Sequence, residues 1–526
     1  MVFLRKSAGL VALAALVGLG VSVPLLAADE RARLLVGNTI LLSVAVAAAS
    51  TLFGAPLAFL LVRSDAFARK PAGVLLLALL FMPLYLQAAA WQAGFGLQGW
   101  YTAIAGGPVV LDGWRGAIAV HTLAAMAWVV VIVGVGLLLA EPELEEAALL
   151  DGTSGQVFRR VTLLRTAHAV GAAFLWVAVT TAGEMTVTDL FQVRTYAEQL
   201  YTQFALGDVA GAAPWNTVPS VIATLWVIAA GLLLTSRLVA PDRHASERPC
   251  RVFRLGRWRA PASALMLSAV GFLVGVPLAS LVVKAGMVVA RQEHGLARHW
   301  SARQCGAMIL GSPARFSREF GWSLAIAALA ATAAVAVGLI LAWNARRGGW
   351  RAAPAWLAVA MCLALPGPLI GLGLIACFNA PGWPWLLDLY DHSIAPIWIA
   401  QTVRALPLCT LVLWYALRTI SPDVLHSATL EGATALARFF YVVLPQRWPA
   451  VAAAWLVALA VAWGELSASI LVVPPGVTTL PIQIFGLIHY GVDDQVAGIS
   501  LVVTGTFVVL VLLLRMVARR ARQDQL

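Results

Sequence analysis

Three charged residues lie inside long apolar stretches of this chain, where an ionisable side chain is costly and is therefore a candidate for function. Two are acids, Glu184 and Glu465, each directly after a glycine, and the third is Arg404. Two carboxylates that face each other would attract a hard cation, or they would anchor neighbouring helices by hydrogen bonds with no functional role. Arg404 would balance one of the acids or meet an anionic group of a ligand. The sequence leaves these alternatives open.

A polar module occurs twice, as EPELEEAALLDGTSGQVFRRVTLL at 141–164 and as SPDVLHSATLEGATALARFFYVVLP at 421–445. Each copy begins with a proline, Pro142 or Pro422, and acids follow, which is typical of the first turn of a helix. Alanines come next and leave room for another surface to approach closely. A glycine then permits a turn before a second short helix. The sequence therefore predicts a polar helix–turn–helix at both places.

The composition is that of a polytopic membrane protein. Of the 526 residues, 61% are hydrophobic and 12% are charged, whereas soluble domains carry about 25% charged residues. The net charge of +11 does not indicate nucleic-acid binding, because most arginines fall in short loops predicted to lie on one side of a membrane. The five cysteines form no CxxC pair, so we expect no metal site. None of the three lysines ends a Gly-rich phosphate loop, so this chain is not predicted to be an ATPase or to bind a cofactor of its own.

Twelve apolar segments reach the length of about 20 residues that a bilayer requires. They begin near Ser7, Gly37, Ala72, Arg115, His168, Thr217, Ala260, Phe320, Pro354, Ile394, Trp448 and Gly498. The first is expected to be an uncleaved helix rather than a signal peptide. The basic loops predict that both termini are cytoplasmic, as the positive-inside rule requires. One loop on the predicted outer side contradicts the rule, since it contains Arg291, Arg298, Arg303, Arg315 and Arg318.

The second half of the chain repeats the first. Pro142 matches Pro422 at an offset of 422 − 142 = 280, and Glu184 matches Glu465 at 465 − 184 = 281. Such a slowly drifting offset indicates an internal duplication.

We therefore predict an all-α fold of two six-helix repeats. The repeats are residues 1–240 and 260–526, and an Arg-rich linker at 241–259 is expected to touch anionic lipid headgroups in the cytoplasm. Because six is an even number, both repeats enter the membrane with the same polarity. A pathway is expected between them.

The polar modules resemble the cytoplasmic coupling loops of ATP-binding-cassette (ABC) importer permeases, whose short helix docks in a groove on a separate ATPase subunit. The first loop, 141–167, contains the pattern Glu-Ala-Ala, three residues, Gly, and the second loop, 418–447, retains part of it. The matching residues are Glu146, Ala147, Ala148 and Gly152 in the first loop, and His426, Ala428 and Gly432 in the second. The chain departs from the family where Leu164 replaces a proline and where His426-Ser427 replaces Glu-Ala.

The resemblance implies a transport subunit of the bacterial inner membrane rather than an enzyme. Two ATPase subunits, which bind ATP and Mg²⁺, are then expected to dock on the cytoplasmic side. A periplasmic substrate-binding protein is expected on the opposite side.

The segment at 464–491, GELSASILVVPPGVTTLPIQIFGLIHYG, resembles the ferric-iron branch of this family. Glu184, Glu465 and Arg404 would then line the substrate pathway. Fused permeases for thiamine share the layout, and polyamine and phosphonate permeases are related, so these substrates stay open. A secondary transporter driven by an ion gradient is the main alternative class, although it has no use for two ATPase-docking loops. A membrane enzyme would need clustered His, Asp or Glu, and the eight histidines are scattered.

Overall fold

The computed structural model describes residues 30–103, 106–140, 142–207, 252–292, 295–346 and 352–523. The chain divides into two compact units. The N-terminal unit contains the described residues up to Arg315 together with Ile484–Thr504. The C-terminal unit contains Phe316–Gln483 and the described residues from Gly505 onward.

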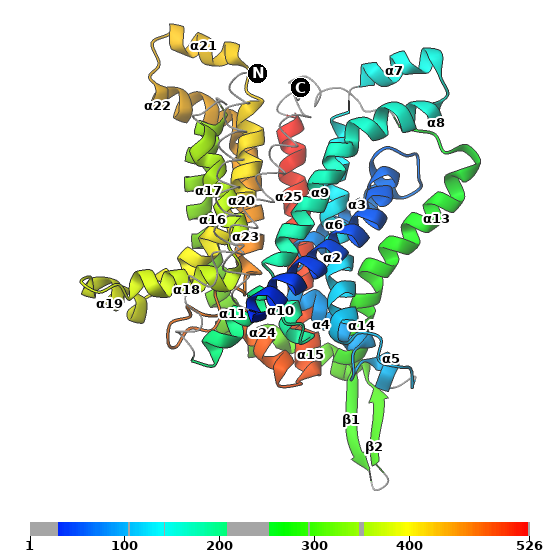
Figure 1. The fold of residues 1–526 in the computed structure, drawn as a ribbon, viewed down its shortest axis with the longest axis vertical. Coiled ribbons are helices and arrows are strands. Elements are labelled where there is room, and N and C mark those ends of the chain that lie inside the picture. Colours follow the sequence, from blue (N-terminus) through cyan, green and yellow to red (C-terminus); the bar gives the residue numbers. More distant parts are fainter. Residues whose placement is uncertain are drawn as a thin grey trace. The chain divides into compact units, whose positions relative to one another are not determined.

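The N-terminal unit is built around three long helices that pack against one another, α2, α6 and α9. Its elements are α2 (Glu30–Val62), α3 (Arg69–Phe81), α4 (Leu84–Phe95), α5 (Trp100–Ala103), α6 (Gly113–Leu138), α7 (Pro142–Asp151), α8 (Ser154–Val157), α9 (Leu163–Ala182), α10 (Thr186–Leu190), α11 (Tyr196–Ala205), α13 (Arg259–Val270), α14 (Val276–Ala285), β1 (Met287–Gln292), β2 (Gly295–Trp300) and α15 (Ala302–Arg315) (Figure 1). One π-helical turn, Phe158–Thr162, joins α8 to α9. A second, Gly271–Gly275, joins α13 to α14.

The C-terminal unit has a corresponding set of three packed helices, α16, α20 and α23. Its elements are α16 (Ser317–Ala345), α17 (Ala353–Ala364), α18 (Gly367–Phe378), α19 (Pro384–His392), α20 (Ala395–Arg418), α21 (Pro422–Leu430), α22 (Ala435–Ala437) and α23 (Leu444–Trp463). A π-helical turn, Arg438–Val443, joins α22 to α23. The last two helices, α24 (Leu480–His489) and α25 (Asp493–Gln523), contribute residues to both units.

The order of elements in the first half recurs in the second. A long helix, a bent helix pair, a second long helix, a short polar helix, a π-helical turn and a third long helix follow one another in both halves. The packing also recurs, because Gly54 in α2 and Gly338 in α16 hold matching places. A Cβ atom at Gly54 would lie 2.8 Å from the Val129 side chain of α6, and one at Gly338 would lie 3.3 Å from the Leu413 side chain of α20. Small residues at such points let membrane helices approach closely.

The predicted membrane segments agree with the described part of the chain. Eight helices are long and apolar enough to cross a bilayer, and two bent pairs bring the number to ten. These ten correspond to the predicted segments other than those near Ser7 and Thr217, which lie outside the described residues. The protein is an all-α polytopic membrane protein, and the count of twelve stays a prediction.

Proline breaks two segments that the sequence analysis treated as continuous spans. α3 and α4 meet at 106°, and α17 and α18 meet at 107°. Pro83 and Pro366 are the N-cap residues of the second helix of each pair, and the residues before them, Met82 and Leu365, are extended. Proline disfavours helical conformation in the preceding residue and lacks an N–H donor, which explains both breaks.

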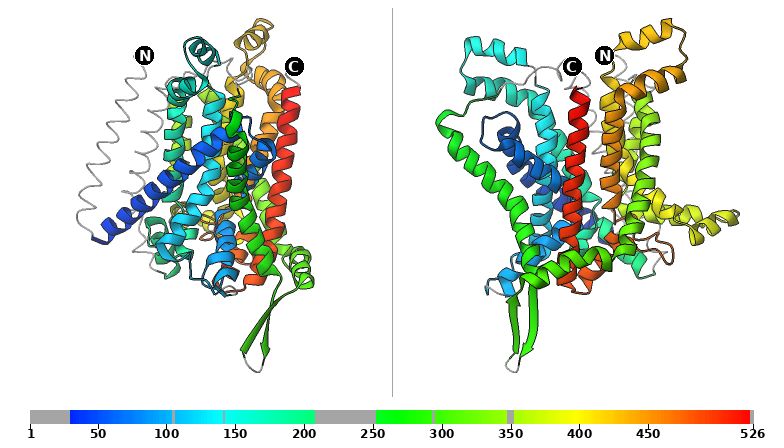
Figure 2. Two further views of the ribbon diagram at one scale, coloured as in Figure 1. Left: turned by 90° about the vertical axis from the view of Figure 1, so that its right-hand side faces the viewer. Right: turned by 180° about the vertical axis from the view of Figure 1, so that it is seen from behind.

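A two-stranded hairpin, β1 paired antiparallel with β2, is an element that the sequence analysis did not predict. It projects from the end of the N-terminal unit that lies opposite α7 (Figures 1 and 2). This placement agrees with the prediction that the Arg-rich loop and the first polar module face opposite sides. Within the expected linker, residues 241–251 lie outside the described part of the chain, and the rest packs on the N-terminal unit.

Candidate functional site

The first polar module forms two short helices, α7 and α8. α7 carries Glu143 and Glu145 in its first turn, where the helix dipole favours acids. α8 begins with a capping box between Thr153 and Gln156, in which each side chain bonds the backbone of the other residue. The predicted helix–turn–helix is therefore present in this module.

Glu146 and Ala147 of this module are exposed, and Ala148 is half-buried. The neighbouring acid Glu145 is instead fully buried and forms an ion pair with the guanidinium of Arg63. Its carboxylate also accepts a hydrogen bond from Thr162 Oγ1 at 2.7 Å. This role of Glu145 was not predicted, because neither Glu145 nor Arg63 stands out in sequence from the other charged residues next to apolar segments.

Arg63 connects three elements at the base of the module. It follows α2, donates from Nη1 to the backbone oxygen of Leu137 in α6 at 3.1 Å, and pairs with Glu145 in α7. Either charge alone would be strongly unfavourable in this buried position, so the ion pair favours the arrangement in which the two side chains meet. The position of α7 on its unit is therefore closely defined.

The second polar module forms α21 and α22, and it is held differently. Ser421 accepts a hydrogen bond from the Asp423 N–H and Thr434 accepts one from the Ala437 N–H, so both helices have side-chain caps. Ala428 is buried and His426 is exposed. At the place of Glu145 stands Leu425 (145 + 280 = 425), which is half-buried and cannot form an ion pair.

The most exposed leucine of each module lies at the same place in both. Leu150 on α7 is 87% exposed, and Leu430, the last residue of α21, is 88% exposed. Their numbers differ by 430 − 150 = 280, the offset of the two modules. Neither residue could be recognised from the sequence, because a leucine in a largely apolar chain gives no distinct signal.

A π-helical turn with an aromatic contact lies at the end of both modules. Phe158, the first residue of one turn, lies 4.5 Å from Phe59 of α2 between ring centroids. Phe439 in the other turn lies 5.1 Å from Trp343 of α16. Single π-helical turns inside α-helices are frequent at functional sites.

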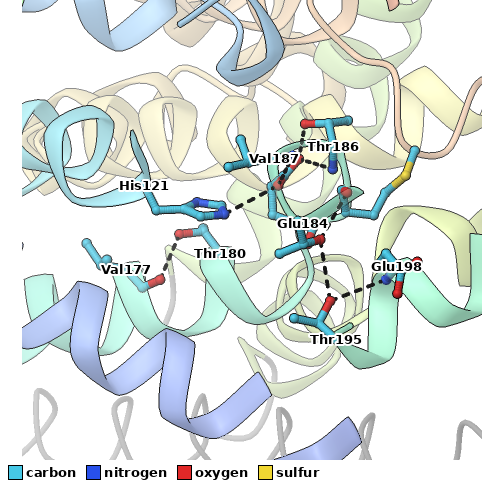
Figure 3. A network of polar contacts seen from close by, with 10 residues as sticks. His121, Val177, Thr180, Glu184, Thr186, Val187, Thr195 and Glu198 are labelled. Carbon is cyan, nitrogen blue, oxygen red and sulfur yellow. Dashed lines mark hydrogen bonds and ion pairs between the residues drawn. The ribbon is translucent and has the colours of Figure 1, made fainter. Parts of the chain in front are cut away.

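Glu184 caps the segment that follows α9. Its Oε1 accepts the Thr186 N–H at 2.7 Å, and its Oε2 accepts the Val187 N–H at 3.0 Å. The Nε2 atom of His121 in α6 lies 3.6 Å from Glu184 Oε2. Figure 3 shows His121 pointing toward the carboxylate, and the polar network continues to Thr195 and Glu198.

Glu465 has the same role after α23. Its Oε1 accepts the Ala468 N–H at 2.8 Å, and its Oε2 accepts the Ser469 N–H at 3.0 Å. Arg404 of α20 places Nε 4.0 Å from Glu465 Oε1. The structure therefore brings together two of the predicted charged residues, and it also pairs Glu184 with His121.

The two residues that lie beside the acids, His121 of α6 and Arg404 of α20, are on the same face of equivalent helices. Gln401 holds the place of His121 (121 + 280 = 401), and Arg404 lies three residues further on. Residues three apart in a helix are neighbours on one face. No group of three or more His, Cys, Asp or Glu side chains suited to a metal ion occurs among the residues that the structure describes.

Comparison with known proteins shows which transport proteins this chain resembles in sequence. Residues 334–523 match the model of the family described as binding-protein-dependent transport system inner membrane component. The putrescine transport system permease protein PotI of Escherichia coli (strain K12) is 32% identical over 212 residues, which are 39% of this chain and 73% of that protein. This chain belongs to that transport-component family.

Other members of the family are also similar. The "Putative 2-aminoethylphosphonate transport system permease protein PhnV" of Salmonella typhimurium (strain LT2) is 28% identical over 173 residues, 32% of this chain and 62% of that protein. The spermidine/putrescine transport system permease protein PotC of Haemophilus influenzae is 26% identical over 201 residues, 38% of this chain and 75% of that protein. The chain is accordingly a membrane-embedded permease component of an ABC importer.

Proposed function

We propose that this chain forms both halves of the membrane pathway of an ABC importer and that separate ATPase subunits dock on its two polar modules. The recurring order of elements in the two halves supports a fused two-repeat permease. The proposed arrangement has two ATPase subunits at the modules, cytoplasmic termini and a periplasmic binding protein on the opposite side. ATP and Mg²⁺ would bind to the ATPase subunits and not to this chain.

The pair Leu150 and Leu430 is the observation that carries the docking proposal. An exposed leucine at the same place on two short polar helices has no role in the packing of its own unit. Burying one leucine side chain in a partner's groove stabilises a complex by about 1.5–3 kcal/mol. Glu146, Ala147, Ala148 and Gly152, with His426 and Gly432, would form the remaining docking surface, whereas Ala428 is buried beneath it.

The substrate that we propose is a small aliphatic amine of the polyamine class. The similar permeases are named for putrescine, spermidine and 2-aminoethylphosphonate, and all three compounds carry a primary amine on a short alkyl chain. 2-Aminoethylphosphonate is the second candidate. These relatives favour amines over the ferric iron that the segment at 464–491 suggested, so we do not retain the iron assignment.

The contacts of Glu184 and Glu465 favour the structural alternative that the sequence left open. Both oxygens of each carboxylate already accept backbone N–H groups, and each carboxylate has a neighbouring His or Arg. We propose that these acids shape the ends of α9 and α23 along the pathway. Arg404 would then balance the charge of Glu465 rather than bind an anion.

Docking can be tested with Leu150→Ser and Leu430→Ser. The matched control is Leu310→Ser, because Leu310 is 82% exposed and its helix, α15, lies at the end of the N-terminal unit opposite α7 (Figure 1). The measurement is the amount of ATPase that co-purifies from native membranes. We expect at least a tenfold weaker association for each module variant, the equivalent of about 1.4 kcal/mol. If all three variants co-purified with the same amount of ATPase, the docking proposal would be wrong.

The transport class and the substrate require a separate measurement. The permease, its co-purifying ATPase and the periplasmic binding protein would be reconstituted in liposomes and supplied with labelled putrescine, 2-aminoethylphosphonate, thiamine or Fe³⁺. We expect ATP-dependent uptake of an amine that an ionophore does not abolish. Uptake driven by an ion gradient without ATP would instead support the secondary-transporter alternative.

A further inference from the structure

One aromatic residue of the Arg-rich linker is buried although its neighbours are exposed. Phe253 is 7% exposed, whereas Val252 and Arg254 are exposed and Trp258 is 62% exposed. A membrane-facing linker would not require this burial. The residue therefore has a specific contact surface within the protein.

That surface is the base of the first polar module. The Phe253 ring lies 5.9 Å from the Phe59 ring and 5.7 Å from the Phe158 ring, measured between centroids. The guanidinium carbon of Arg63 lies 5.5 Å from the centre of the Phe253 ring, a cation–π distance. Phe253 therefore contacts α2, the π-helical turn after α8 and the ion-pair arginine together.

Backbone and side-chain hydrogen bonds fix this contact. The Phe253 N–H donates to the Arg63 oxygen at 2.7 Å, and Phe253 forms a parallel β-bridge with Ser64. Asp65 Oδ1 accepts the Leu255 N–H at 2.9 Å, and the Asp65 backbone oxygen accepts Arg259 Nε at 2.9 Å.

The next turn of the chain extends the attachment. Ser263 of α13 accepts the Phe67 N–H through its hydroxyl oxygen at 2.8 Å. Residues 253–263 are therefore joined to residues 63–67 over their whole length. We call residues 253–263 the clasp.

The clasp covers the ion pair that positions α7. The guanidinium of Arg63 contacts both the Phe253 ring and the Glu145 carboxylate, and Glu145 also accepts a hydrogen bond from Thr162. An apolar ring over an ion pair excludes water, which strengthens the electrostatic interaction in its reduced dielectric. Residues 256–263 of the clasp are also the first part of the apolar helical segment Gly256–Ala285, a candidate membrane span.

We propose that Phe253 is a positioning residue for ATPase coupling, which acts through Arg63 and Glu145 to hold the first module and links that module to the span Gly256–Ala285. This inference rests on the proposed docking function. The second module has Leu425 at the place of Glu145, so the clasp acts on the first module alone. A displacement of α7 by the ATPase would then be passed to the span through the clasp.

The test compares Phe253→Ala with Trp258→Ala, which removes an exposed ring from the same linker. In the reconstituted transporter we expect Phe253→Ala to raise the ATP hydrolysed per substrate imported at least fivefold, while Trp258→Ala leaves the ratio unchanged. Amide exchange of residues 142–162 should also become faster in Phe253→Ala. An unchanged ratio and unchanged exchange in Phe253→Ala would overturn the proposal.

A double-variant comparison tests the route through the ion pair. If Phe253 acts through Arg63 and Glu145, the double variant Phe253→Ala, Glu145→Gln should hydrolyse within twofold the same amount of ATP per substrate imported as Glu145→Gln alone. The reason is that substitutions within one network do not have additive effects. Multiplied effects of the two substitutions would contradict that route. Should Phe253→Ala not accumulate in membranes, Phe253→Leu keeps most of the apolar volume without the ring and carries the same comparison.

Failure of the clasp can be distinguished from failure of the proposed function. If the unmodified protein neither binds an ATPase nor couples ATP hydrolysis to import, the proposed function is wrong. If the unmodified protein is coupled and Phe253→Ala is equally coupled, only the clasp proposal is wrong.

Discussion

At the scale of single residues, the two acids that follow α9 and α23 act as caps. Glu184 and Glu465 each accept two backbone N–H groups with two different oxygens. A glutamine has one acceptor oxygen and one amide donor, so it cannot replace both contacts. Substitution to glutamine therefore changes structure as well as charge at these two positions.

We predict that Glu465→Gln lowers the free energy of unfolding of the detergent-solubilised protein by about 1–3 kcal/mol, which is the cost of leaving a buried donor unsatisfied. Glu184→Gln should cost less, because the Glu184 side chain is more exposed than that of Glu465. Thermal unfolding followed by tryptophan fluorescence measures both variants. Glu431→Gln at the exposed end of α21 is the control, and a Glu465→Gln protein as stable as this control would show that the cap is dispensable.

At the scale of elements, the two polar modules have the same order of helices, but the backbone differs at the glycine of the turn between them. Gly432 has a φ of +82°, in the left-handed region, whereas Gly152 does not adopt a positive φ. A Cβ atom at Gly152 would lie 3.1 Å from Oε1 of Gln156, the movable end of a side chain. The turn after α21 therefore requires glycine more strictly than the turn after α7.

We expect Gly432→Ala to destabilise the turn by roughly 1–2 kcal/mol, because residues with a Cβ atom are strained in the left-handed region. Gly152→Ala should have a smaller effect, since only the Gln156 side chain must shift. Proteolytic cleavage rates at the two modules in membrane vesicles provide the measurement. Faster cleavage at the first module in Gly152→Ala than at the second in Gly432→Ala would contradict this order.

At the scale of the whole molecule, a segment of the second half of the chain belongs to the N-terminal unit. Ile484–Thr504 belongs to that unit, and His489 at the end of α24 places Nε2 3.0 Å from Asp189 Oδ2 of α10. α24 is too short to be a candidate span, so this pair lies outside the membrane-spanning segments. The hydrogen bond to the Asp189 carboxylate raises the pKa of His489, against an opposing effect of partial burial.

This contact predicts a pH-dependent stability. Because the pKa of His489 in the folded protein lies above its ordinary value of about 6.5, the pair stabilises the fold below that pH and loses its effect as the pH rises through the folded pKa. His489→Gln should thus lower the melting temperature at pH 5.5 and leave it unchanged at pH 8.5. The effect should stay below about 1 kcal/mol, because the His489 side chain is 45% exposed and water screens the pair.

Asp189→Asn serves as the matched variant, since it removes the other partner. It should show the same loss at pH 5.5, and the double variant should show no further loss. If His489→Gln changed the melting temperature by the same amount at pH 5.5 and at pH 8.5, the ion pair would not contribute to stability.

The sequence alone determined the class of protein and the positions of its polar modules. Apolar segments of membrane length cannot leave their backbone groups unpaired in lipid, so they had to be helices. The matched prolines and glycines located both modules because they act on the local backbone: proline restricts φ, and glycine permits conformations that other residues avoid. The order of spans in the described region followed from these local constraints.

Only the tertiary structure decided which polar groups meet. Glu145 and Glu146 are adjacent and chemically identical in sequence, yet one is buried on Arg63 and the other is exposed. Phe253 lies 190 residues from Arg63 (253 − 63 = 190) in an Arg-rich linker, and its burial depends on a surface formed by α2 and the turn after α8. Contacts between residues so distant in sequence are set by helix packing, which no local pattern encodes.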